Sequence, residues 1–359
     1  MKKSTYKSEI LLLITFLLVS FTISAEEVTK EFHQKYTAGA NTTLDVSNRY
    51  GDVVIESWNN KEIVIDVKVT VDYPSRDRAE KLLSYIDVKF SEGNNLVSAK
   101  TVIDDKFNFS GWGNSKRFSI DYNIKMPVEA ALELVNKYGN TDIDELHGLV
   151  NLNIRYGNLT AGKFTRGNVK PLSKVNIAYG KGSIDETGWL DLYIRYCGNM
   201  NIGKSQALLL DSKYSKLALG DASSLVGESR YDNIRIESIN NLVLENGYTE
   251  VNIGTLTKKL DYNGSYGSFS VDRIPVGFES LDVETRYMGV KLGIAEAASY
   301  SLDAKVSYGG LRYNEDNFIN RNRIVENNST QVSGYVGKDE SASSTVKVSS
   351  SYGSVRLYQ

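Results

Sequence analysis

Few residues of this chain have the types and spacing that chemistry at a site requires. The 359 residues include only two histidines, His33 and His147, and a single cysteine, Cys197. Neither histidine lies at metal-ligand spacing from cysteines or carboxylates, and we find no GxSxG, phosphate-loop or zinc motif. Nothing near Cys197 in the sequence would lower its pKa, so we expect it to fill a corner of the fold. The sequence therefore predicts no catalytic residue, no cofactor and no metal site.

One regular pattern of charged residues is a candidate for ligand binding. Seven residues that directly precede a repeated tyrosine are basic: Arg49, Lys137, Arg155, Arg195, Lys213, Arg230 and Arg286. If repeats stack about 4.8 Å apart, Arg195, Lys213 and Arg230 form a column. We take Arg155, Arg195, Lys213 and Arg230 as candidate ligands for an anionic glycan or lipid headgroup, because arginine suits phosphate and carboxylate groups. A lattice of surface ion pairs with the acids two residues earlier (Asp211, Glu228, Glu245 and Glu284) is the alternative.

Trp112 is a second candidate for ligand binding. It lies between two glycines in the polar stretch "NFSGWGNSKR". An exposed tryptophan in a loop can stack on a sugar. A tryptophan that folds back onto a hairpin is the alternative for the same residue.

The elements that position these residues follow from the spacing of the tyrosines. The repeated tyrosines are Tyr50, Tyr138, Tyr156, Tyr179, Tyr196, Tyr214, Tyr231, Tyr248, Tyr266, Tyr287, Tyr308 and Tyr352. From Tyr138 to Tyr308 the successive spacings are 18, 23, 17, 18, 17, 17, 18, 21 and 21 residues. Tyr352 follows 44 residues later, which fits two repeats with a tyrosine missing or a loop inserted. Such a period is typical of stacked structural units.

Each repeat alternates apolar and polar residues before its tyrosine. Val150, Leu152 and Ile154 precede Tyr156 with polar residues between them. Period two predicts a strand, with its apolar residues and the tyrosine on the inward face. Leu159 lies an odd number of residues after Tyr156, so the chain must turn between them. We predict that the frequent glycine after the tyrosine makes this turn, because glycine does so at least cost.

A unit of about 18 residues with two short strands cannot bury its apolar face alone, whereas stacked units can. We therefore predict an all-β fold, a right-handed parallel β-solenoid with coils of about 18 residues. A left-handed hexapeptide helix would need one aliphatic residue every six positions, which the chain lacks. The second residue before the tyrosine is often an amide or a serine, which predicts either stacked amide ladders or isolated turn asparagines. Its members include Asn48, Asn136, Ser212, Ser229, Asn246 and Ser350.

Residues 59–126 interrupt the repeat. "KEIVIDVKVTVDY" predicts a strand from Ile63 to Tyr73, and "PSRDRAEKLLSYI" predicts a short helix that begins near Ser75. We expect residues 26–126 to form an antiparallel β region with this helix and a first repeat near 44–58, and residues 127–359 to form the solenoid. The chain stops in a strand, "SYGSVRLYQ", without a polar cap. That open end predicts edge-to-edge self-association or pairing with residues 314–340.

The first 25 residues have the features of a signal peptide. Lysines precede an apolar run from Ile10 to about Phe21, and Ala25 ends the segment. An uncleaved N-terminal anchor is the alternative, but the run is short for a transmembrane helix. Cleavage removes three lysines and Glu9, which changes the net charge from −2 to −4. We expect an exported protein, in the periplasm or at the cell surface, with no transmembrane helix in the mature chain and no nucleic-acid partner.

The stretches "LDVSNRYGDVVIESW" and "LELVNKYGNTDIDELHGLVNLNIRYGN" resemble the β-strand-repeat putative adhesin domains of exported bacterial proteins, a family common in Bacteroidetes. The resemblance covers most of the mature chain and implies a parallel β-solenoid without catalytic residues. Tyr214-Ser215, Tyr231-Asp232, Tyr248-Thr249 and Tyr287-Met288 depart from its Tyr-Gly motif. We expect a non-enzymatic envelope protein that binds a glycan or another protein. The alternative is a polysaccharide-cleaving β-helix enzyme, which needs acids and bases that converge in a groove.

Overall fold

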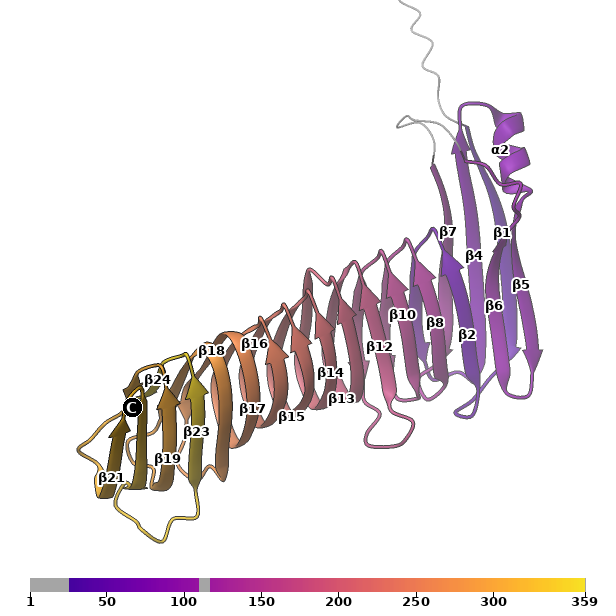
Figure 1. The fold of residues 1–359 in the computed structure, drawn as a ribbon. Coiled ribbons are helices and arrows are strands. Elements are labelled where there is room, and N and C mark those ends of the chain that lie inside the picture. Colours follow the sequence, from indigo (N-terminus) through magenta and orange to yellow (C-terminus); the bar gives the residue numbers. More distant parts are fainter. Residues whose placement is uncertain (1–25, 110–116, 359) are drawn as a thin grey trace, which may run out of the picture.

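The computed structural model describes residues 26–109 and 117–358, and these residues form a long rod of stacked strands (Figure 1). The predicted signal peptide and Trp112 lie outside the described residues. The rod is one hydrogen-bonded sheet of 24 strands with mostly parallel neighbours, which confirms the predicted all-β solenoid. Its right-handed winding stays a prediction. No helix within the described ranges has both the length and the apolar character that crossing a bilayer requires.

Long antiparallel strands and one helix form the N-terminal end. Their bounds are β1 (Glu26–Thr37), β4 (Glu62–Tyr73), α2 (Arg76–Leu83), β5 (Ile86–Gly93), β6 (Leu96–Ile103) and β7 (Arg117–Pro127). β4 pairs antiparallel with β1 and β7, and β5 pairs antiparallel with β6. The helix buries Ala79 and Leu82 and packs against β1 and β4. This region thus has the predicted antiparallel pairing and the predicted short helix.

Beyond this region the chain winds in coils, each with one strand before a tyrosine and one after it. The early coils keep these strands separate, as β2 (Thr43–Arg49), β3 (Val53–Trp58), β8 (Ala131–Lys137), β9 (Thr141–Leu146), β10 (Val150–Arg155), β11 (Leu159–Phe164) and β12 (Ser173–Ala178). Later coils join them, as β13 (Lys181–Arg195), β14 (Asn199–Lys213), β15 (Lys216–Arg230), β16 (Asn233–Gly247), β17 (Glu250–Ile274) and β18 (Ser280–Ile294). We call the side built from strands that precede a tyrosine face A and the other side face B.

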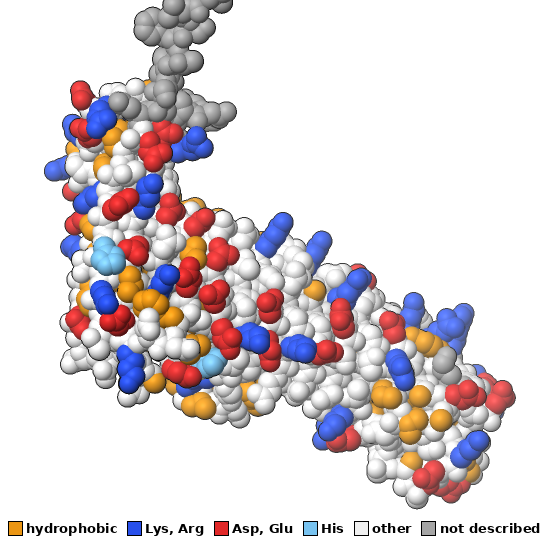
Figure 2. Space-filling model, turned by 180° about the vertical axis from the view of Figure 1, so that it is seen from behind, with side chains coloured by type: hydrophobic (Ala, Val, Ile, Leu, Met, Phe, Trp, Pro, Cys, Tyr) orange, Lys and Arg blue, Asp and Glu red, His pale blue; other side chains and the backbone are white. Residues whose placement is uncertain are grey.

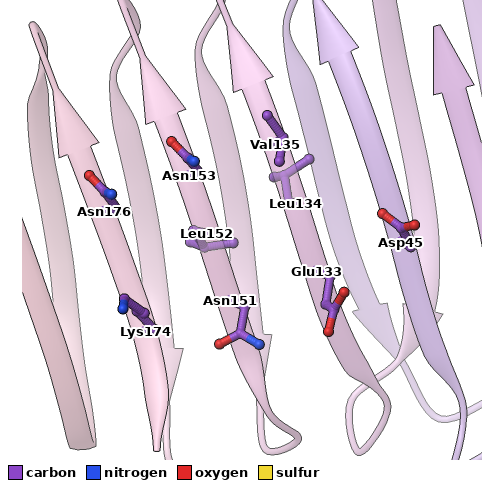
Figure 3. Close-up of a pocket in the computed structure, with 9 residues that line it drawn as sticks. All are labelled: Asp45, Glu133, Leu134, Val135, Asn151, Leu152, Asn153, Lys174 and Asn176. Carbon is purple, nitrogen blue, oxygen red and sulfur yellow. The ribbon is translucent and has the colours of Figure 1, made fainter.

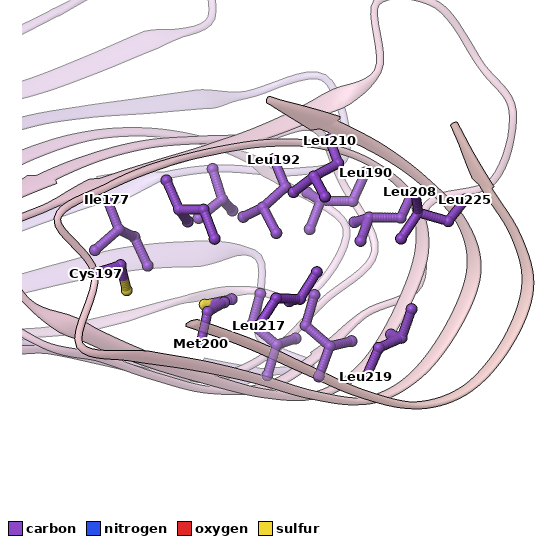
Figure 4. Packing of buried hydrophobic residues seen from close by; sticks show 14 of the residues in the cluster. Ile177, Leu190, Leu192, Cys197, Met200, Leu208, Leu210, Leu217, Leu219 and Leu225 are labelled. Carbon is purple, nitrogen blue, oxygen red and sulfur yellow. The ribbon is translucent and has the colours of Figure 1, made fainter. Parts of the chain in front are cut away.

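The core lies between face A and face B. Leu190, Leu192 and Leu208 of face A oppose Leu217 and Leu219 of face B across a narrow interior (Figure 4). Every second residue of each strand enters this interior, as the period-two alternation predicts. Removing these aliphatic surfaces from water is the main stabilising contribution to stacking of the coils.

The repeated tyrosines point outward, so the prediction that they share the inward face is wrong. All twelve have φ between 49° and 64°, in the left-handed region, and their exposed fractions are 37–58%. Strict alternation along the strand would place the tyrosine on the inward side. A residue with left-handed φ changes the direction of the strand, so the tyrosine side chain points outward instead. Ile154 and Leu159, on either side of Tyr156, are both buried. The left-handed backbone of the tyrosine therefore allows the residue two positions before it and the residue three positions after it both to face inward.

The glycine after the tyrosine permits close backbone contact rather than a turn. A Cβ on Gly157 would lie 1.8 Å from the carbonyl oxygen of Gly139, and a Cβ on Gly180 would lie 1.9 Å from that of Gly157. None of these three glycines has a positive φ. The prediction that glycine makes the turn is therefore wrong. Glycine recurs here because neighbouring coils touch backbone to backbone.

The C-terminal end is closed by strands out of chain order. Their bounds are β19 (Tyr300–Ser307), β20 (Leu311–Arg312), β21 (Phe318–Glu326), β22 (Ser329–Val336), β23 (Thr345–Ser351) and β24 (Val355–Tyr358). β23 lies between β18 and β19, and β24 lies between β18 and β20. The 44-residue gap before Tyr352 thus contains an inserted hairpin, β21–β22, and β22 pairs with β19.

The terminal strands are not the open edge that the sequence led us to expect, because both have neighbours on two sides. Residues 314–340 do pair with the end of the rod, but through β22 on β19 rather than on the terminal strands, and β21 is the outermost strand of face A in the described chain. On this strand Arg323 lies opposite Val332, which is fully buried. Directly opposite residues share one side of the sheet, so Arg323, which is exposed, continues the row of Val332 onto the last strand. Charges on an edge strand oppose pairing of that edge with another chain. Self-association stays a prediction, and Arg323 disfavours it.

Candidate functional site

The tyrosines form one continuous stack along the corner where face A meets face B. Neighbouring ring centroids are 4.7–5.1 Å apart, with interplanar angles of 3–14°. At its C-terminal end the order is Tyr287, Tyr352, Tyr308, which follows the insertion of β23 and β24. Each inner ring covers the faces of two neighbours. The stack therefore offers hydroxyl groups and ring edges to a ligand rather than open aromatic faces.

Side-chain amides support the same corner, although not at the predicted position. Asn136, two residues before Tyr138, is buried, but its Nδ2 donates to the backbone carbonyl of Asn140 at 2.9 Å. A ladder forms two residues after the tyrosine instead. Asp52 Oδ1 accepts the N–H of Asn140 at 2.7 Å, and Asn140 Oδ1 accepts the Nδ2 of Asn158 at 2.9 Å. The corner is thus held by hydrogen bonds between coils.

Buried polar side chains replace the glycine in some later coils. The N–H of Cys197 donates to Ser215 Oγ at 3.1 Å, and that of Ser215 donates to Asp232 Oδ1 at 2.6 Å. Asp232 also accepts the hydroxyl of Ser229 at 2.6 Å, and its own N–H donates to Thr249 Oγ1 at 3.3 Å. Burial raises the pKa of the Asp232 carboxyl above its ordinary value, against the opposing effect of these hydrogen bonds. These side chains bind neighbouring coils together, which explains three departures from the Tyr-Gly motif, at Ser215, Asp232 and Thr249.

The backbone register places the basic residues in one column beside the tyrosine stack. Arg49 pairs with Lys137 and Lys137 with Arg155, and we call these three the N-terminal cation group. Arg195 pairs with Lys213 and Lys213 with Arg230, and we call these three the C-terminal cation group. Ala178 separates the two groups. Of the four candidate ligands, Arg155 therefore belongs to the first group and the other three to the second.

The two cation groups have different neighbours in the next outward column. Beside the C-terminal cation group, two residues earlier on the same strands, stand Tyr193, Asp211 and Glu228, so acids adjoin Lys213 and Arg230. Arg195 Nη2 contacts Asp211 Oδ2 at 2.7 Å. Beside the N-terminal cation group stand Ser47, Val135 and Asn153, and no ion pair joins that group to any residue of the described ranges. In the described chain Arg195 is the one member of the C-terminal cation group with an ion pair, whereas Lys213 and Arg230 have acids in the adjoining column without an ion pair. The N-terminal cation group has no acid in that column and is the better candidate for a ligand stripe.

Charges on the opposite side of the rod are mixed in sign. In Figure 2, which shows the side hidden in Figure 1, blue and red side chains are interspersed along the rod. Strands of face B carry paired residues, such as Lys125 with Glu56 at 3.0 Å and Lys35 with Glu62 at 2.8 Å. Exposed pairs of this kind contribute little to stability, but they leave little net charge for a ligand. The unpaired cations of face A therefore stand out.

A depression of about 470 Å³ lies on face A next to the N-terminal cation group (Figure 3). Its polar lining residues are Asp45, Glu133, Asn151, Asn153, Lys174 and Asn176. Asn151 pairs with Glu133 on one side and Lys174 on the other, and Asn153 pairs with Val135 and Asn176. The lining residues therefore form two parallel rows across β8, β10 and β12. Charged and amide groups converge there on the outer surface of the sheet.

The charged residues at the rim of the depression contact other side chains, whereas the asparagine amides inside it have no hydrogen-bond partner among the described residues. Lys174 Nζ lies 4.2 Å from the ring centre of Tyr193 and 4.0 Å from Asp191 Oδ2. Asp45 Oδ2 contacts Lys100 Nζ at 2.9 Å. No side-chain hydrogen bond joins Asn151, Asn153 or Asn176 to another residue within 26–109 and 117–358, and Asn153 Oδ1 is buried without a partner there. Amides with open donors and acceptors are suited to bind hydroxyl groups.

Sequence reasoning missed these amides. The signal was present as asparagines at outward positions in "NLNIRYGN" and "KVNIAYG". Outward polar residues are common on solvated strands, so the pattern alone does not distinguish a binding residue from a solvent-exposed one.

The histidines and the cysteine lie away from this depression. His147 is held between Glu145, at 2.7 Å, and Glu129, at 3.0 Å, and these two bonds raise its pKa. The sequence did not indicate this contact with two carboxylates. Cys197 is buried, and burial raises the pKa of its thiol to about 11, which fits the predicted corner-filling role. No group of three or more His, Cys, Asp or Glu side chains in the described parts of the chain could hold a metal ion.

No family model and no curated protein matches the chain. Solved structures similar to it include a putative cell adhesion protein from Clostridium sporogenes (12% identity, 92% of this chain and 100% of that chain, TM-score 0.20). Others are putative adhesins from Bacteroides fragilis (10%, 91% and 97%, TM-score 0.24) and Parabacteroides merdae (11%, 92% and 97%, TM-score 0.27). Their descriptions agree with the family that the sequence resembles. At these identities and TM-scores the likeness says nothing about a ligand or a site.

Proposed function

We propose that the protein is an exported, adhesin-like protein of the cell envelope that binds anionic glycans without cleaving them. The observation that supports this function is the N-terminal cation group, a column of three cations with no acidic residue in the adjoining outward column. Like charges about 4.8 Å apart on a sheet repel each other. A bound polyanion would relieve that repulsion, and a long chain of acidic sugars can follow the axis of the rod. The predicted signal peptide supports a location in the periplasm or at the cell surface.

The test compares the two cation groups. One variant carries Arg49→Ala, Lys137→Ala and Arg155→Ala, and the matched control carries Arg195→Ala, Lys213→Ala and Arg230→Ala. Each exposed ion pair with a ligand contributes about 0.2–1 kcal/mol. We therefore expect the first variant to bind polygalacturonate on the order of tenfold more weakly and the control to bind nearly as wild type.

The measurement is calorimetric titration of folded protein at low and moderate salt. Binding of the wild type should weaken as salt rises, because the contacts are exposed. Wild-type affinity in the first variant would overturn the assignment to the N-terminal cation group.

The non-enzymatic part of the proposal has its own test. Incubation with acidic polysaccharides should release no new reducing or unsaturated ends. Release of such ends, abolished by Glu133→Gln or Lys174→Ala, would support the alternative of a polysaccharide-cleaving enzyme. These two residues are chosen because both line the depression.

A further inference from the structure

We infer that the depression on face A is a sugar-selective subsite that binds the ring hydroxyl groups of one acidic sugar unit, while Arg155 binds the carboxylate of that unit. The inference rests on the proposed function and adds to it the chemical class of the ligand, a polymer of hexuronic acid rather than any polyanion. The site consists of Asn151, Asn153, Asn176 and Glu133, beside Arg155 of the N-terminal cation group.

The first argument is the unmet hydrogen bonding of the amides. Asn153 Oδ1 is buried, and nothing in the described ranges donates to it. A buried acceptor without a donor is unfavourable, so a turn of the Asn153 amide toward the depression, where a ligand hydroxyl donates to this oxygen, removes that cost and gains affinity. The amides of Asn151 and Asn176 lie beside it, one in the next row and one on the next strand (Figure 3). Together they present several open donors and acceptors to one ligand.

The second argument is the mixture of donors and acceptors. Asn153 Oδ1 and the Glu133 carboxylate can only accept hydrogen bonds, so they need ligand groups that donate. Hydroxyl groups of a sugar ring both donate and accept, whereas the oxygens of phosphate or sulfate esters at neutral pH mainly accept. The depression therefore favours the hydroxyl-bearing part of a glycan over a polymer that carries charge alone.

The third argument is the placement of the cation. Asn153 and Arg155 are two residues apart on β10 and both point outward. Their Cα atoms are thus roughly 7 Å apart along the strand. One pyranose ring with its carboxylate spans such a distance. Lys174 cannot replace Arg155 as freely, because Tyr193 and Asp191 already contact it.

The experiment measures two ligands on three variants of the full mature chain. The probes are polygalacturonate and inorganic polyphosphate. Asn153→Leu keeps the size of the side chain and removes its polar atoms. Asn263→Leu is the matched control, because Asn263 occupies the same outward column on β17, outside the depression. Arg155→Ala removes the shared cation.

We expect Asn153→Leu to weaken polygalacturonate binding at least tenfold and to leave polyphosphate binding unchanged. Arg155→Ala should weaken both, and Asn263→Leu neither. If Asn153→Leu does not fold, as judged by circular dichroism, Asn153→Ser replaces it with the same expectation. Equal effects of the Asn153 variant on both probes, or none on either, would overturn the subsite and leave the proposed function standing. A wild-type protein that binds neither probe would overturn both.

Discussion

Replacing Tyr214 by alanine tests whether the outward tyrosine stack stabilises the solenoid. The ring of Tyr214 lies between those of Tyr196, at 5.0 Å, and Tyr231, at 4.9 Å, with interplanar angles of 4° and 3°. Its backbone has a φ of 53°. The hydroxyl group has no hydrogen-bond partner within the described residues. Stacking and backbone strain therefore act at the same residue with opposite signs.

The magnitudes separate the two effects. Each aromatic pair contributes about 0.5–1.5 kcal/mol, so the loss of two neighbours costs about 2 kcal/mol. The left-handed conformation costs a residue with a Cβ about 1–2 kcal/mol. Alanine loses the stacking and keeps the strain, so we expect Tyr214→Ala to destabilise by about 2 kcal/mol. Glycine loses the stacking but relieves the strain, so Tyr214→Gly should cost about 1 kcal/mol. Tyr214→Phe should be close to neutral.

Urea unfolding followed by circular dichroism gives the order of stability, with variants compared at equal slope. Tyr308→Ala is the matched control, because the Tyr308 ring stacks on Tyr352 alone within the described chain and should lose about half as much. A glycine variant as unstable as the alanine variant would refute the reasoning about strain. An alanine variant as stable as wild type would refute the reasoning about stacking.

Three further predictions concern the coil contacts. Gly157→Ala places a Cβ 1.8 Å from the carbonyl oxygen of Gly139, so we expect a loss of more than about 3 kcal/mol, measured by the urea midpoint; a wild-type midpoint would contradict it. The raised pKa of Asp232 means that its contribution is complete below the unfolded pKa, near 4, and is lost as pH rises through the folded pKa. Asp232→Asn should therefore flatten the pH dependence of the midpoint between pH 4 and 7, and an unchanged slope would count against it. The raised pKa of His147 gives a contribution that is complete below about pH 6.5 and is lost as pH rises through the folded pKa. Since His147 is partly exposed, His147→Gln should remove less than about 1 kcal/mol at pH 5.5 and nothing at pH 9, as thermal unfolding at both pH values can show.

Much of the fold could be predicted because the spacing of the repeated residues gives the length of one coil directly. The spacing of Tyr196, Tyr214 and Tyr231 by 18 and 17 residues is the length of one coil, and the alternation around Leu152 and Ile154 identifies the buried rows. Both signals come from a constraint that acts on every coil, the burial of one side of each strand. The positions of the basic column follow from the same register.

The direction of the tyrosines could not be predicted in this way. Whether Tyr156 points in or out depends on the sign of one φ angle, and the spacing of Ile154 and Leu159 is compatible with either choice. Left-handed φ values are uncommon for residues with a Cβ, so the alternation argued for the inward side. Stacking on neighbouring coils supplies the compensation, and this contact is visible only once the coils are placed.

The candidate site shows the same limit. The basic column is a property of one strand position, and the sequence predicts it. Asn153 and Asn176 both lie three residues before a tyrosine, so the repeat predicts their pairing, but it does not predict the depression that they line. Asn153 is missing a partner only in the assembled sheet. Trp112 stays a prediction, because it lies outside the described residues.

The order of strands at the far end has a consequence for biogenesis. A chain that crosses a membrane from its N-terminus can complete its coils one after another as far as β18. The next coil must then wait, because its neighbour is the segment that is made last. Until residues 345–358 have been made, the coil of β19 and its hairpin have no strand through which to pair with the rod. The C-terminal strands thus join the last coil to the rod, and a chain that stops a few residues early should be cleaved faster by added protease at its undocked end.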